Sequence, residues 1–267
     1  SLSVLLNTNI GWRSSSLLVG SLGVGTAALA GVVLKDPSNT SEAGAAAEVQ
    51  AKPDVEALSI GESISTVLSS HTVQFLFLAS ALRFGAGYGI GVWAAPYFRE
   101  AFPAQAGEYA VLNAFVVAGG GVASSILGGL ISDKFADPRV KAWVPMIGSL
   151  LAVPLWIAVV TSTDFYTAIA ALFLEYLVAE CWFGPSVTIL QEVLPSNVRG
   201  IAQGGFSMLT ALGNISPVII GSLVQGGTPL SDTLAQVVPV FYAGAAVFFF
   251  LTGQSLGQFH QGKEKVQ

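Results

Sequence analysis

The sequence predicts an all-α, multi-pass membrane protein with seven transmembrane helices. Hydrophobic residues make up 52% of the 267-residue chain and charged residues only 10%, whereas a soluble globular protein carries about 25% charged residues. The mean hydropathy is +0.67, and the apolar residues gather into seven stretches of roughly the 20 residues that a helix needs to cross a bilayer. The lipid bilayer is therefore the predicted surrounding of most of the chain.

The seven stretches are almost free of charge. Five of them contain no charged residue, the second contains Arg83, and the fifth contains Glu175 and Glu180. Glycine and proline lie inside several stretches, which membrane helices tolerate because neighbouring groups satisfy the freed backbone. In chain order, the predicted spans are 15–34, 72–97, 109–131, 142–160, 168–190, 203–224 and 235–256.

The hydropathy pattern also divides the chain into segments. Residues 1–34 hold the first helix, residues 35–70 form an acidic linker with a short surface helix near 55–68, residues 71–257 form a bundle of six helices, and residues 258–267 form a polar tail. Lys and Arg concentrate in the loops of one membrane side, the side that faces the cytoplasm. Eight of them share the side of the linker and the C-terminus, which we expect to face the cytoplasm, stroma or matrix, and two lie opposite: Lys35, Lys52, Lys134, Arg139, Lys141, Arg199, Lys263 and Lys265, against Arg13 and Arg99.

Several functional classes do not fit this sequence. The single Cys181 excludes an internal disulfide and a CxxC motif, and His71 and His260 are too far apart in sequence to make a metal signature. No nucleophile elbow, HExxH or P-loop is present, so we predict no enzyme, no catalytic or metal residues and no cofactor. The chain has no basic patch for nucleic acid, and its last span has no lysine for a retinal Schiff base.

The three charges inside apolar spans are the first candidates for function. A charge in the bilayer core costs several kcal/mol and usually faces a cavity or a partner, so we expect Arg83 and Glu175 to face the bundle interior. Glu175 is either a proton-coupling acid or a protonated carboxyl hydrogen-bonded to a neighbouring helix. Arg83 either binds an anionic group of a solute or pairs with Glu175, and a purely structural pair is the alternative. Glu180 lies five residues after Glu175 and so points elsewhere around an ideal helix, which favours a structural role.

Three stretches resemble the C-terminal half of the major facilitator superfamily, closest to its Spinster-like branch. Residues 128–134, Gly-Gly-Leu-Ile-Ser-Asp-Lys, are similar to the family's loop motif between helices 8 and 9, although Ala136 replaces the usual glycine. Residues 194–200, Leu-Pro-Ser-Asn-Val-Arg-Gly, follow Glu175 and Trp182 as in helix 10 and the next loop. Residues 213–217, Gly-Asn-Ile-Ser-Pro, resemble a helix 11 signature in which the family's Asp is Asn214 here.

The resemblance implies roles for several residues. Asn214 joins Arg83, Glu175 and Glu180 as a candidate for solute transport or proton coupling, and a gating loop would be formed by Gly129, Asp133, Lys134, Arg139 and Arg199. We expect Asp133 at the cytoplasmic end of its helix, near a helix N-terminus or a basic side chain.

The resemblance implies a secondary transporter of a small organic or lipid-like solute, with proton coupling as a possibility. Such a carrier has twelve helices, and this chain resembles the last seven, so its first helix would belong to an N-terminal bundle that is otherwise absent. The partners would then be the solute or proton and either the missing N-terminal half or neighbouring membrane subunits. The alternative is a transporter-derived, non-transporting subunit of a larger membrane complex.

Overall fold

The computed structural model describes residues 2–33 and 58–264, which form two separate units. The first unit is the helix α1 (Leu2–Val33). Its helical course is interrupted at Gly11, whose φ of 75° lies in the region that glycine adopts without steric cost. The segment Ile10–Val33 of α1, which begins at this kink, is long and apolar enough to cross a membrane.

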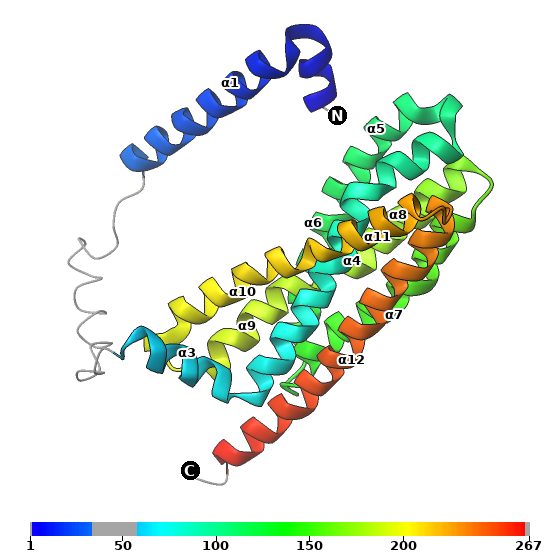
Figure 1. Ribbon diagram of the computed structural model, residues 1–267. Coiled ribbons are helices and arrows are strands. Elements are labelled where there is room, and N and C mark those ends of the chain that lie inside the picture. Colours follow the sequence, from blue (N-terminus) through cyan, green and yellow to red (C-terminus); the bar gives the residue numbers. More distant parts are fainter. Residues whose placement is uncertain (1, 34–57, 265–267) are drawn as a thin grey trace. The chain divides into compact units, whose positions relative to one another are not determined.

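The second unit is an all-helical bundle with six further candidate spans (Figure 1). Together with α1 they make seven, which confirms the number predicted from hydropathy. Each span consists of one helix or of several helical pieces in direct succession. In chain order, the elements are α4 (His71–Ala101); η2 (Pro103–Gln105), α5 (Ala106–Phe115), η3 (Val116–Gly120) and α6 (Gly121–Lys134); α7 (Val140–Thr161); α8 (Phe165–Ala179), η4 (Glu180–Trp182) and α9 (Phe183–Val193); η5 (Ser196–Val198), α10 (Arg199–Gly213) and α11 (Ile215–Gln225); and α12 (Leu230–Glu264).

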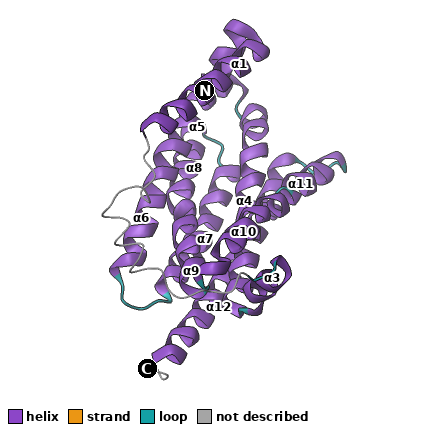
Figure 2. Ribbon diagram, turned by 90° about the vertical axis from the view of Figure 1, so that its left-hand side faces the viewer, coloured by secondary structure: helices purple, strands orange, loops and turns teal. Residues whose placement is uncertain are grey.

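Within the bundle, α4 and α12 lie side by side and form the largest helix–helix contact. On its other side α12 packs against α7, and α7 packs against α8, while α10 and α11 pack against α4. The described part of the bundle contains helices and loops and no strands (Figure 2). This arrangement leaves α4 in contact with α10, α11 and α12, so a side chain on α4 is well placed to contact several spans.

One end of the bundle collects most of its basic residues. Thr72 at the start of α4 shares a 2.7 Å hydrogen bond with Ser255 near the end of α12, and Lys141 at the start of α7 pairs with Glu192 at the end of α9. The loop between α6 and α7 lies at the same end, because Arg139 contacts Gly257 of α12. The grouping agrees with the predicted distribution of charge; which membrane side this end faces stays a prediction.

Two segments at the edges of the predicted bundle are helical in the structure. The short helix α3 (Ile60–Ser69) lies where the surface helix was expected, and a capping box between Ser59 and Glu62 starts it. Hydrogen bonds from Ser59 hold the pKa of Glu62 below its usual value. The helix α12 runs to Glu264, past residue 257, because the polar residues that were assigned to a tail continue its helical hydrogen bonding. Residues 35–57 of the predicted linker lie outside the described residues.

Close packing of α6 against the fifth span depends on a glycine. A Cβ at Gly128 would lie 2.8 Å from both Cα and Cβ of Cys181, and it would also overlap the Cys181 carbonyl oxygen. The adjacent Gly129 has no atom within 4 Å of such a Cβ. Gly128 and Gly129 therefore allow a matched test, because the same substitution at adjacent positions meets different surroundings.

We expect Gly128→Ala to destabilise the protein by about 1–3 kcal/mol, because the added methyl group forces two backbones apart. Gly129→Ala should be neutral or stabilising by up to about 1 kcal/mol, because alanine favours a helix more than glycine does. The measurement is the thermal unfolding midpoint of each variant in detergent micelles. Equal midpoints for the two variants would contradict the close contact at Gly128.

Candidate functional site

Arg83 lies at the centre of a polar network inside the bundle. It sits in the middle of α4, and its side chain is only 2% exposed. Its Nη2 donates to Oε1 of Glu180 at 2.8 Å, and Nε and Nη2 both donate to the carbonyl oxygen of Ala179, at 3.2 and 3.0 Å. The guanidinium also lies over two aromatic rings, 5.0 Å from the centroid of Tyr242 and 5.7 Å from that of Trp182. This single side chain therefore contacts the fifth and seventh spans.

Glu175 occupies a separate and equally buried position on α8. It is 1% exposed, and Tyr242 of α12 donates its hydroxyl hydrogen bond to Glu175 Oε1. The tyrosine is equally buried, at 1% exposure. Both sequence-predicted charges, Arg83 and Glu175, thus lie in the interior of the bundle, and the Tyr242 ring stands between the guanidinium of one and the carboxyl of the other as a partner of both.

Glu180, the partner of Arg83, was not named among the alternatives that the sequence suggested. Arg83 forms its ion pair with Glu180, and no ion pair joins it to Glu175 in the described structure. The expectation that Glu180 points away from this region rested on a continuous helix. The helix instead ends at Ala179 and continues as the 3₁₀ turn Glu180–Trp182, which turns the Glu180 side chain toward Arg83.

Pro185 supplies a physical reason for this interruption. A proline inside a helix has no N–H to offer the carbonyl four residues earlier, and its ring clashes with that carbonyl. For Pro185 the affected carbonyl is that of Cys181, inside the 3₁₀ turn. Arg83 then satisfies the Ala179 carbonyl at the same interruption. The sequence signal for this turn is the pair Gly184-Pro185 in the middle of a span.

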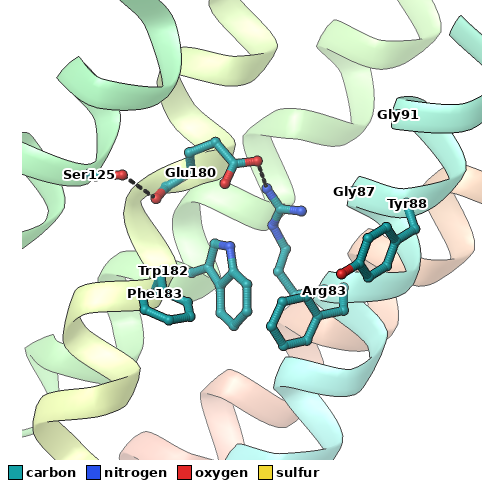
Figure 3. A pocket seen from close by; sticks show the side chains of 9 residues that line it. Arg83, Gly87, Tyr88, Gly91, Ser125, Glu180, Trp182 and Phe183 are labelled. Carbon is teal, nitrogen blue, oxygen red and sulfur yellow. Dashed lines mark hydrogen bonds and ion pairs between the residues drawn. The ribbon is translucent and has the colours of Figure 1, made fainter. Parts of the chain in front are cut away.

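A pocket of about 520 Å³ opens beside the Arg83–Glu180 pair. Figure 3 shows the ion pair between the rings of Trp182 and Phe183 on one side and that of Tyr88 on the other. The Glu180 side chain is 32% exposed, in contrast to that of Arg83, so the carboxylate is the charged group that the pocket presents. The other lining residues come from α4 and α6: Phe84, Gly87, Gly91 and Ser125.

A second pocket of about 470 Å³ lies on the other side of Glu180. Ser125 and Glu180 line both pockets, and the second has mainly aliphatic walls from η3 and α6, together with Tyr176. Ser125 also donates a 3.4 Å hydrogen bond to the backbone carbonyl of Glu180 (Figure 3). The aromatic pocket and the aliphatic pocket therefore both adjoin the polar side chain of Glu180. Sequence reasoning missed the aromatic walls. The available signal was the aromatic residues that lie near Arg83 and Glu180 in the chain: Phe84, Tyr88, Trp182 and Phe183.

Asn214 does not join this network. It is exposed at the junction of α10 and α11, and its Nδ2 donates to the Thr210 carbonyl at 2.9 Å. In this position it closes the end of α10 and lines neither of the two pockets beside Glu180.

The predicted gating-loop residues lie at the basic end of the bundle. Asp133 and Lys134 are exposed at the end of α6. A small pocket there is lined by Asp133, by Gly129 of α6, by Lys141 of α7 and by the first turn of α9. Arg199 donates from Nε to the Leu194 carbonyl at 3.2 Å. Among the described residues, no group of three His, Cys, Asp or Glu side chains is placed to hold a metal ion.

Comparison with known proteins places this geometry in context. The chain is 22% identical over 220 residues to an MFS-type efflux pump of Mycolicibacterium smegmatis (strain ATCC 700084 / mc(2)155), and the match covers 81% of this chain and 49% of that protein. The chain thus spans about half the length of this curated relative. A crystal structure of a bacterial homolog to the human lysosomal transporter Spinster, inward-facing and unoccupied, has a similar fold. The TM-score is 0.66 at 19% identity, over 96% of this chain and 63% of that one.

The family itself is shown by the sequence match. The model of the Major Facilitator Superfamily matches residues 1–217, which is most of the chain. The matched region includes α4 with Arg83 and the fifth span with Glu175 and Glu180. The protein belongs to the major facilitator superfamily.

Proposed function

We propose that this chain is the C-terminal half of a Spinster-like secondary transporter, which moves a small organic or lipid-like solute and couples that movement to protons. The observation that carries the proposal is the buried network of Arg83, Glu175 and Tyr242 beside an open pocket. Ionisable residues within membrane spans are costly and generally mark solute or proton pathways. A purely structural bundle has no need of an ion pair whose carboxylate is partly exposed in a pocket.

The two carboxyl groups suit different tasks in such a carrier. Glu180 borders both pockets, and we assign it and Arg83 to solute binding. Glu175 is enclosed and contacts Tyr242. Because it is shut off from water in this conformation, Glu175 exchanges a proton only when the packing around it opens. Protonation and conformational change are then linked, as alternating access requires.

The shape and lining of the pockets support the solute class. Aromatic rings line one pocket and aliphatic side chains the other, with Glu180 between them. Sites of this family type lie between two helical bundles near the bilayer midplane. We therefore infer that an N-terminal half, from this protein or a neighbouring subunit, completes the pathway. A non-transporting subunit of a membrane complex is the outcome that the following experiment would support instead.

The test uses the full-length protein in liposomes and a panel of lysolipids, organic cations and organic anions. Glu175→Gln should abolish the dependence of uptake on a pH gradient while leaving solute binding intact, because the amide keeps the shape and the acceptor oxygen but cannot release a proton. Glu108→Gln, at an exposed carboxylate, is the matched control and should transport like the wild type. Unchanged pH dependence would remove Glu175 from the mechanism, and absence of transport for every solute would favour the non-transporting subunit.

The thermal stability of variants should also distinguish the roles of Glu175 and Glu180. Glu180→Gln leaves the buried Arg83 guanidinium without its counter-charge, which we expect to cost on the order of 3 kcal/mol. Glu175→Gln should cost less, because the amide oxygen still accepts the hydrogen bond of Tyr242. Thermal unfolding in detergent measures both, and the double variant Arg83→Gln/Glu180→Gln should recover part of the loss. A larger loss for Glu175→Gln than for Glu180→Gln would show that Glu180 is not the essential counter-charge.

A further inference from the structure

A second polar pocket lies at the basic end of the bundle, away from the Arg83 network. Its volume is about 270 Å³, and it lies between the loop that precedes α7 and the last turns of α12. Four of its six lining residues are polar, and two of the six are small or rigid: Asp137, Arg139, His260 and Gln261, with Pro138 and Gly257. Nothing in the proposed transport mechanism uses this pocket.

The guanidinium of Arg139 is the unusual feature of the pocket. Arg139 is partly buried, and it packs directly on Gly257, where a Cβ would lie 3.0 Å from Arg139 Cζ. Its backbone takes part in hydrogen bonds at the start of α7, but its side chain has no hydrogen bond, ion pair or ring contact within the described structure. Five N–H donors in a fixed fork are therefore held beside a cavity without an acceptor.

The neighbouring groups leave that fork available. Asp137, the nearest acid in the chain, accepts a 2.9 Å hydrogen bond from the backbone N–H of Arg139 and does not pair with the guanidinium. His260 is partly buried, and its Nε2 is a buried atom without a partner. A buried polar group without a partner calls for a ligand, a water or an ion. His260 Nε2 is such a group, and it lines the same pocket as the unpaired guanidinium of Arg139.

The position of the pocket along the membrane spans indicates the kind of ligand that it binds. The pocket lies at the first turn of the span Val140–Thr161 and the last turns of the span Leu230–Gly262, which is the level of lipid headgroups for spans of this length. The arginine fork matches the oxygen geometry of a phosphate. Basic pockets between membrane helices on the cytoplasmic side are typical binding places for anionic headgroups.

We propose that this pocket binds a phosphate group, and that the phosphate is that of an anionic phospholipid headgroup. Arg139 donates to the phosphate oxygens, His260 lies beside them, and Gly257 provides the space in which the guanidinium rests. Asp137 shares the pocket and weakens the binding of an anion. The lipid so held ties the loop between α6 and α7 to the end of α12.

Two glycines of α12 allow a matched test. Gly257→Ala should push the guanidinium out of its place without removing its charge, whereas Gly262→Ala has no atom within 4 Å of the new methyl group. Both changes gain helix propensity alike. The full-length protein in detergent would be titrated with short-chain phosphatidylglycerol, short-chain phosphatidylcholine and inorganic phosphate, and binding followed by native mass spectrometry and thermal shift.

We expect the wild type and Gly262→Ala to bind phosphatidylglycerol in preference to phosphatidylcholine. Gly257→Ala and Arg139→Gln should each weaken this binding about tenfold or more, which is the effect of losing a charged hydrogen bond. Asp137→Asn should strengthen it, because the amide still accepts from the Arg139 backbone and the repelling charge is gone. Arg139→Gln keeps the test valid if Gly257→Ala does not fold.

The lipid and phosphate arms separate the two sources of the ligand. Binding of phosphatidylglycerol well above inorganic phosphate supports the lipid headgroup, and equal binding of the two would overturn the lipid assignment in favour of free phosphate. No preference for either anion over phosphatidylcholine, or equal affinities for Gly257→Ala and Gly262→Ala, would eliminate the site.

Discussion

The bridge from Arg83 to the interruption between α8 and α9 is the interaction on which the functional part of this bundle depends. Through three hydrogen bonds Arg83 holds the Ala179 carbonyl and the Glu180 carboxylate. In hydrocarbon a backbone group freed from its helix must find another partner, and a buried guanidinium needs a counter-charge. Arg83 donates to the freed Ala179 carbonyl, and Glu180 at the interruption supplies the counter-charge for the guanidinium. The interruption of the helix and the buried arginine are therefore mutually stabilising features of one site.

The number and the approximate limits of the spans were predictable from hydropathy alone, because the bilayer imposes the same length and composition on every span. All seven predicted spans correspond to candidate spans in the structure. The family followed from the order of short motifs in the loops. The exact end of α12 was not predictable in this way, since its last turns are polar and their helical state depends on hydrogen bonding that composition does not report.

The site was predictable in its residues but not in its connections. The cost of charge in a membrane was enough to select Arg83, Glu175 and Glu180, and the first two are buried inside the bundle. Pairing of Arg83 with Glu175 was one of the expected alternatives, and Arg83 pairs instead with Glu180, whose expected direction assumed an unbroken helix. A change to a 3₁₀ turn over three residues alters the direction of a side chain by more than a hydropathy pattern can register. Tyr242, the partner of Glu175, carries no charge and therefore gave no signal of its own.

The bundle also shows a division between continuous and interrupted spans. The spans of α7 and α12 are continuous helices, and they pack against each other and against α4 and α8. The third span contains the π-helical turn η3 and the fifth contains the 3₁₀ turn η4. Both interruptions line the pockets beside Glu180.

Interruptions of this kind have a physical consequence for motion. A continuous helix resists bending, whereas a π-helical or 3₁₀ turn changes its hydrogen bonds at lower cost and is often found at functional positions. The glycines at η3 allow the turn to lie close to Tyr176, where a Cβ at Gly120 would come within 3.1 Å of that residue's Cβ. The parts of the pocket walls that η3 and η4 contribute are therefore easier to deform than the continuous helices α4, α7 and α12. In the proposed transporter, a solute that exchanges contacts with Glu180 would act on the interrupted part of the fifth span, and alternating access requires such a link between binding and conformational change.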